Sequence, residues 1–199
     1  MSHKLTETKD LTDDKVVFGL WLYILSDCVL FAGLFATYAV QHGQLFGGPA
    51  PSQIFDLQNV VIETLLLLTS SFTCGLAVLF AFSEGKANST NKVVAMLGLT
   101  LLLGLAFVGL ELREFHTLLL NGNSWQQSGF LSAFFTLVGT HGLHVTLGSL
   151  WMLVLMVHIY MRGISTGNKR KLLAFSIFWH FLDIIWIFIF TFVYLFGLM

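Results

Sequence analysis

Five long apolar stretches, separated by short polar or glycine-rich segments, constrain the fold of this chain more than any other feature. They cover residues 16–41, 57–82, 93–119, 129–160 and 172–198. Each is at least as long as the roughly 20 residues that a helix needs to cross a bilayer. The sequence therefore predicts an all-α fold, an integral membrane bundle of five transmembrane helices over residues 16–199, with a polar tail over residues 1–15.

The composition agrees with a protein that lies almost entirely within the bilayer. Only 11% of the residues are charged and 56% are hydrophobic, whereas a soluble domain carries about 25% charged residues. The formal net charge of −1 gives no electrostatic reason to expect nucleic acid as a partner. Cys28 and Cys74 both lie inside apolar stretches, so we expect them to pack in the bundle and not to form a disulfide.

The basic residues predict the orientation of the bundle, because cytoplasmic loops are enriched in lysine and arginine. Nine of the ten lysine and arginine residues lie in the N-terminal tail, between the second and third stretches, or between the fourth and fifth. The tail also lacks the apolar core and cleavage site of a signal peptide. We therefore expect a cytoplasmic N-terminus and a periplasmic C-terminus, with Arg113 as the one exception on the outer side.

One layer of polar residues is predicted near the middle of the membrane. At a rise of about 1.5 Å per residue, similar depths are reached by Asp27, His141, His144, His180 and Asp183. His180 and Asp183 are three residues apart and share one helix face. Ionisable groups at this depth are costly and are usually paired or functional. We expect this pair to hydrogen-bond within the bundle and to tie the last helix to the fourth or the first.

A second polar layer is predicted toward the outer surface. Glu63 lies in the first turns of the second stretch, and the last turns of the third contain Glu111, Arg113 and Glu114. A bond between a guanidinium and a carboxylate is the least costly way to keep both charges in lipid. We therefore expect Arg113 to pair with Glu63 or with an acid of a neighbouring helix or chain.

Each group of polar residues has two interpretations. The histidines are either a polar seam between helices or ligands of a haem or metal, with His180 facing His141 or His144. The full set of paired histidines or Glu-x-x-His motifs of a di-haem or di-metal bundle is absent from the sequence. Asp27 and Glu63 are either buried acids, neutral or paired, or members of a proton relay. The sequence thus predicts no catalytic, cofactor-binding or metal residues, and it leaves proton conduction open.

Four strings of residues resemble subunit III of the haem–copper terminal oxidases. They are SDCVLFAGLFATY at residues 26–38, LELREF at 110–115, GTHGLHVTLGSLW at 139–151 and FWHFLDIIWIFIFTFVYLFG at 178–197. The H-G-x-H-V and W-H-F-x-D-x-x-W patterns are highly specific together, and the resemblance covers essentially the whole membrane part. Within this family, the chain resembles the bacterial quinol-oxidase branch, of the cytochrome bo type. The features that carry this resemblance are five helices in place of seven, the short length and the string SDCVLF.

This resemblance implies a function by association. Such a complex oxidises ubiquinol, reduces oxygen to water and pumps protons across the bacterial plasma (inner) membrane during aerobic respiration. The resemblance implies that haems and copper lie in subunit I and that this chain packs directly against subunit I. It implies that subunits II and IV belong to the same complex. It also implies bound phospholipid in a cleft between the helices, and a role in assembly, stability and sustained turnover.

Two other functions remain as alternatives. One is a small independent proton channel or transporter that uses the acids and histidines near the midplane. The sequence shows no inverted repeat or broken helix of the kind that transporters contain. The other alternative is a haem carrier of the membrane cytochrome b type. Co-purification with a haem-containing large subunit distinguishes the accessory subunit from the channel, and a Soret band of the isolated chain indicates the haem carrier.

Overall fold

The regular structure of the described chain is entirely helical. The computed structural model describes the backbone of residues 2–44, 57–83 and 89–198, and the side chains of residues 17–44, 57–83 and 90–197. The elements are α1 (Ser2–Gln41), α3 (Leu57–Phe82), α4 (Ser89–Leu120), α5 (Gly129–Arg162), α6 (Thr166–Ile189), the π-helical segment η1 (Phe190–Leu195) and the 3-10 turn η2 (Phe196–Leu198). The predicted all-α fold is confirmed. Because α1 begins at Ser2, the backbone of the predicted N-terminal tail is part of this helix.

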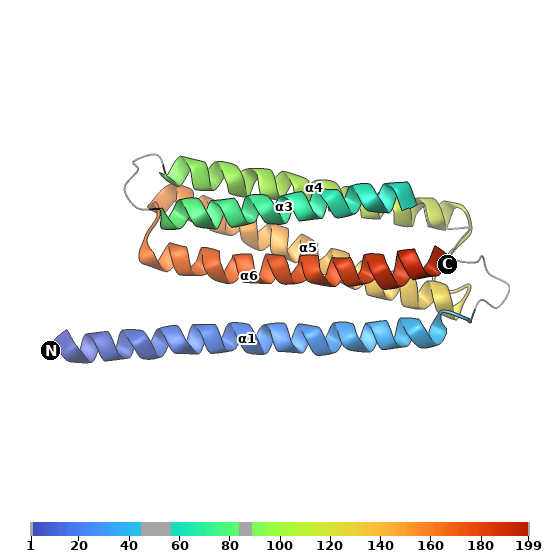
Figure 1. The fold of residues 1–199 in the computed structure, drawn as a ribbon, viewed down its shortest axis with the longest axis horizontal. Helices are drawn as coiled ribbons and strands as arrows, with labels where there is room; N and C mark the ends of the chain where they lie inside the picture. The colour runs from blue at the N-terminus through green and yellow to red at the C-terminus, as the bar shows by residue number, and fades with distance from the viewer. Residues whose placement is uncertain (1, 45–56, 84–88, 199) are drawn as a thin grey trace.

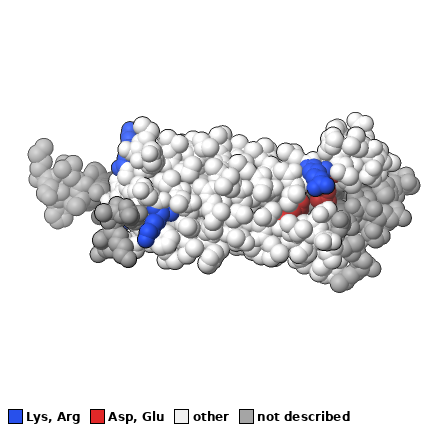
Figure 2. Space-filling view, turned by 90° about the horizontal axis from the view of Figure 1, so that it is seen from above, with Lys and Arg blue, Asp and Glu red and all other residues white. Residues whose placement is uncertain are grey.

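Within the described ranges, five helices are long and apolar enough to cross a membrane. Their spans are Val17–Gln41, Leu57–Phe82, Thr90–Leu120, Gly129–Arg162 and Thr166–Leu195. The prediction of five transmembrane helices is therefore confirmed. On the face seen in Figure 2, charged atoms gather near the two ends of the bundle, and a broad uncharged band lies between them. This distribution suits a protein whose middle contacts hydrocarbon and whose ends reach water.

The helices form a packed group of four with a fifth helix along one side. Helix α3 packs against α4 and α6, and α5 packs against α4 and α6, which closes the group (Figure 1). Helix α1 runs along the flank of this group and packs mainly against α5, with fewer contacts to α6. Successive helices run in opposite directions, so the two termini lie at opposite ends (Figure 1).

Helix α1 is the least buried of the five spans. Only 11% of its most apolar part is buried, compared with 56% for the span that includes α6. Its buried side chains, Ile24, Asp27, Phe31 and Tyr38, recur at helical spacing and form one narrow stripe. The remaining faces expose large apolar side chains such as Trp21 and Val29. In a membrane these faces contact lipid or another protein.

Capping residues fix the ends of the connection between α5 and α6. Gly163 has a φ of 68°, a left-handed conformation that suits glycine, and it ends α5 by donating its N–H to the carbonyl of Ile159. Two residues later, Ser165 caps α6 by accepting a hydrogen bond from the N–H of Asn168. This short turn places α6 directly beside α5.

Trp179 of α6 is the buried side chain on which three other helices converge. A Cβ atom at Gly104 of α4 would lie 3.0 Å from its ring, and one at Gly148 of α5 would lie 3.0 Å from the same ring and 2.9 Å from Phe178. Carbon atoms in favourable contact are about 3.5–4.0 Å apart, so a methyl group at either position would press against these rings. The indole N–H donates to the Ser70 hydroxyl of α3 at 3.1 Å.

Replacement of Gly148 by alanine should destabilise the bundle. The added methyl group would displace Trp179 or Phe178, and such overpacking typically costs about 1–3 kcal/mol. Gly142→Ala is the matched control, because nothing lies within 4 Å of a Cβ at that position of the same helix. Thermal unfolding of the purified protein in detergent should show a lower midpoint for Gly148→Ala only. Equal midpoints for the two variants would contradict the packing role of Gly148.

Candidate functional site

The acid–histidine pair of α6 faces one serine of α3. The Ser71 hydroxyl of α3 forms a hydrogen bond with Nδ1 of His180 and lies near the carboxyl group of Asp183. Ser71 thus faces both polar groups of α6, and Oδ1 of Asp183 has no hydrogen-bond partner among the described residues. The bond between His180 and Ser71 ties α6 to α3, and not to the fourth or first helix as predicted. The cause is the position of α6, which packs with this face against α3.

Two further hydrogen bonds continue this seam between α6 and α3. The Trp186 indole donates to the Thr64 hydroxyl at 3.0 Å, parallel to the bond from Trp179 to Ser70. On the other side of α3, Thr73 shares a 2.8 Å hydrogen bond with Thr100 of α4. No prediction from the sequence assigned these serines and threonines to contacts between helices. The polar run TSSFT at residues 69–73 was the available signal, because small hydroxyl residues inside a membrane helix often bond to a neighbouring helix.

Asp27 of α1 meets His144 of α5 near the middle of both helices. The Asp27 carboxylate oxygen Oδ1 and the His144 nitrogen Nε2 are 3.7 Å apart. The other ring nitrogen, Nδ1, is 2.8 Å from the carbonyl oxygen of Thr140, one turn earlier on α5. The Tyr23 side chain lies near Asp27, one turn earlier on α1. These contacts make Asp27 the polar link between the exposed helix α1 and the rest of the bundle.

His141 is packed as an aromatic side chain. It is fully buried, and its ring stacks on Trp186 with centroids 5.3 Å apart, while Phe107 contacts it edge-on at 5.9 Å. Neither ring nitrogen has a hydrogen-bond partner among the described residues. The structure therefore separates the three midplane histidines: His141 contacts aromatic rings, His144 contacts Asp27, and His180 contacts Ser71. The facing pair of histidines needed for haem ligation is not formed by these contacts.

The acids of the outer layer converge on one another. One carboxylate oxygen each from Glu63 of α3 and from Glu111 and Glu114 of α4 lie within 4.8 Å of one another. Glu111 and Glu114 are three residues apart and so share one face of α4. Arg113 is exposed and forms no ion pair with a described acid. It makes no bond to Glu63, because two residues along a helix correspond to a rotation of about 200° away from Glu111; pairing with an acid of a neighbouring chain stays a prediction.

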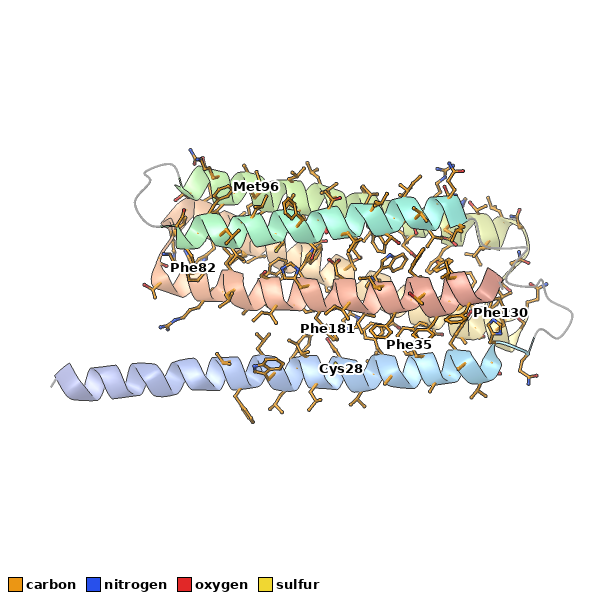
Figure 3. The ribbon with its side chains drawn as sticks, viewed as in Figure 1. Cys28, Phe35, Phe82, Met96, Phe130 and Phe181 are labelled. Atoms are coloured by element: carbon orange, nitrogen blue, oxygen red, sulfur yellow. The ribbon has the colours of Figure 1, made fainter. Side chains whose placement is uncertain are left out.

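Two apolar grooves flank α1. The larger has a volume of about 640 Å³ and separates α1 from the end of α6; its walls are Ala32, Phe35, Ala36, Tyr38, Ala39, His42, Phe188, Phe192 and Phe196. Figure 3 shows Phe35 and Phe181 in the space between the two helices. The smaller groove, of about 360 Å³, lies between α1 and α5 beside Tyr23 and Trp151. Small alanines on α1 opposite phenylalanines on α6 leave the larger groove open.

The Ser71 contact can be tested by removal of one hydroxyl. Ser71→Ala leaves Nδ1 of His180 without its partner, and an unsatisfied buried polar group costs about 1–3 kcal/mol. We expect a lower unfolding midpoint of the detergent-solubilised protein. Thr69→Ala is the control, because this exposed hydroxyl bonds only to the Leu65 carbonyl of its own helix. A midpoint for Ser71→Ala equal to that of Thr69→Ala would show that the bond does not stabilise the bundle.

Comparison with known proteins places almost the whole chain in one family. The family model described as cytochrome c oxidase subunit III matches residues 4–198. The chain is 50% identical to the cytochrome bo(3) ubiquinol oxidase subunit 3 of Pseudomonas aeruginosa, over 98% of this chain and 93% of that protein. It is 50% identical to the protein of the same name from Pseudomonas putida, over 92% of this chain and 86% of that one. The quinol oxidase subunit 3 of Bacillus subtilis is 43% identical over 92% of this chain and 87% of its own length.

Proposed function

Because the chain belongs to the cytochrome c oxidase subunit III family, we propose that it is the non-redox third subunit of a proton-pumping ubiquinol oxidase that reduces oxygen to water. The identity of about one residue in two with subunits of that name, over nearly the full length, carries this proposal. The chain is a multi-pass protein of the bacterial inner membrane. From the distribution of basic residues, we place its N-terminus in the cytoplasm.

The contacts of the midplane residues support an accessory role. His144, His180, Asp27 and Asp183 each lie near a polar side chain of another helix, so these groups hold helices together. In this proposal the haems and copper lie in subunit I, as the resemblance implies, and this chain contributes stability to the assembled oxidase. Subunit I is the direct partner, and subunits II and IV complete the complex.

Helix α1 offers the surface for this association. Its outward faces carry large exposed apolar side chains, including Phe18, Trp21, Leu25 and Val29. A helix with so little burial gains most of its packing from outside the chain, either from lipid or from a partner helix. We place the contact with the oxidase core on this side, and phospholipid acyl chains in the groove between α1 and α6.

A tag on this chain provides the experiment that tests the function. Affinity purification in mild detergent should recover haem-containing subunit I in stoichiometric amounts, together with ubiquinol oxidase activity. The alternative is an independent proton channel formed by Asp27 and His144, and it requires proton flux through liposomes that contain this chain alone. Recovery of the chain without a haem-containing partner, together with such flux, would overturn the proposal in favour of the channel.

Asp183 should affect assembly more than turnover. Asp183→Ala removes the carboxyl group near Ser71, so we expect a smaller yield of complete oxidase with near-normal turnover per haem in the complexes that assemble. Asp183→Asn keeps an accepting oxygen at the same place and should restore the yield. Haem absorbance of the purified membranes and oxygen consumption give the two quantities. A normal yield with a selective loss of turnover in Asp183→Ala would contradict a purely structural role.

The lipid groove can be filled by one substitution. Ala36 lines the groove between α1 and α6, so Ala36→Phe should expel acyl chains from it. Native mass spectrometry of the oxidase should then show at least one fewer tightly bound phospholipid than in the wild type. Ala106→Phe adds the same side chain at an exposed position of α4 and serves as control. An unchanged number of bound phospholipids in Ala36→Phe would exclude this groove as the lipid site.

A further inference from the structure

Three carboxyl groups meet inside the bundle near the end at which α1 and α4 finish. Glu63 lies six residues after the start of α3 at Leu57, and Glu114 lies six residues before the end of α4 at Leu120. At about 1.5 Å per residue, the cluster lies roughly 9 Å from the helix ends. Glu111 lies one turn deeper on the same face of α4. One oxygen from each group is within 4.8 Å of the other two.

The buried members of this cluster have carboxylate oxygens that no described group of the chain satisfies with a hydrogen bond. Glu63 is 1% exposed and Glu111 is 3% exposed. Both carboxylate oxygens of Glu111, and Oε2 of Glu63, have no hydrogen-bond partner among the described residues. Burial of an ionised carboxylate is strongly unfavourable unless it is paired or coordinates a metal. The Glu111 side chain therefore points into a site that calls for a positive charge.

Protons alone do not account for this arrangement. A neutral carboxylic acid still carries an O–H donor that requires an acceptor when it is buried. Neither oxygen of Glu111 forms a hydrogen bond with a described group, and the nearby oxygens of Glu63 and Glu114 belong to further acids. The side chain of another subunit is also excluded from the centre, because α3 and α4 enclose Glu63 and Glu111 almost completely. A small cation, which needs no polypeptide to carry it, fits this enclosure.

The donor set is typical of a hard divalent cation. Three carboxylates supply only oxygen ligands, and the buried Tyr194 of η1 is near enough to interact electrostatically with all three glutamates. Calcium takes oxygen ligands at about 2.3–2.6 Å, so two ligands on opposite sides are about 4.6–5.2 Å apart. Opposite ligands of magnesium, at about 2.0–2.1 Å, are nearer 4.2 Å apart. The glutamate oxygens lie within 4.8 Å of one another and are therefore close enough for one such ion to contact all three.

We propose that Glu63, Glu111 and Glu114 form a structural binding site for a divalent cation of the calcium type. The ion links α3 to α4. The partly exposed Glu114 is the side from which the ion enters. Three carboxylates and one divalent ion leave a single negative charge, which one shared proton neutralises. The cation site does not depend on the proposed oxidase function, because its test measures ion binding and not turnover.

Terbium luminescence in the intact complex tests this site. Terbium(III) replaces calcium at oxygen sites and emits when a nearby indole is excited. The Trp186 ring lies 6.3 Å from the Tyr194 ring. Trp186 is therefore the nearby indole that should sensitise the bound terbium. After removal of metal with a chelator, the wild-type complex should show terbium emission that calcium displaces. Loss of one ligand should weaken this binding at least about tenfold, so Glu63→Gln and Glu111→Gln should shift the titration accordingly.

Two further variants keep the test decisive. Asp27→Asn removes a buried acid of α1 outside the cluster and should leave the titration unchanged. Glu114→Gln, at the partly exposed position, replaces the interior variants if these fail to assemble, and it should also abolish the rise in unfolding temperature that calcium gives the wild type. The proposal is overturned if the wild type gives no calcium-displaceable emission. It is equally overturned if all three glutamine variants bind as the wild type does, or if Asp27→Asn loses binding as they do.

Discussion

Hydrocarbon offers no hydrogen-bond partner, and the arrangement of the helices follows from this constraint. Polar groups that face hydrocarbon find partners only within the protein or in bound ions and water. Helix α6 brings two indoles and an imidazole to one side, and α3 presents hydroxyls at the matching heights. Each bond satisfies both partners at once. The seam of hydrogen bonds therefore sets the depth and rotation of α6 relative to α3, and the apolar core packs around it.

The architecture could be predicted from the sequence, but the pairing of its polar groups could not. The length of the apolar stretches was enough for five helices, and helical spacing correctly placed His180 beside Asp183 on one face. Which helix this face meets depends on the order of the helices around the bundle, and no local pattern encodes that order. The partner is consequently Ser71 of α3. Arg113 shows the same limit within one turn of a helix. It lies next to two glutamates in the sequence, but it does not share their face of the helix.

The two polar layers differ in how they remain stable in lipid. The midplane residues meet other helices one at a time: His180 bonds to Ser71, Asp27 faces His144 at 3.7 Å, and His141 stacks on Trp186. The outer layer concentrates three acids in one place. At Glu111, no hydrogen bond from a described group offsets the burial of the carboxyl oxygens. Its position near the helix ends matters, because an ion from water can reach roughly 9 Å into the bundle far more easily than the midplane.

The division between a tight four-helix group and a loosely packed α1 explains how such a chain acts without a reaction centre of its own. Tyr38 of α1 bonds to the Val193 carbonyl of η1 at 3.4 Å, and Asp27 meets His144, so two polar contacts hold α1 at separate heights. Between and beside them lie grooves wide enough for acyl chains. A helix fixed at two points but bare over most of its surface can be completed by lipid on one side and by a partner subunit on the other. Under the proposed function, the surface through which this chain acts is its periphery, and the contacts of its buried polar residues hold the helices that form this periphery together.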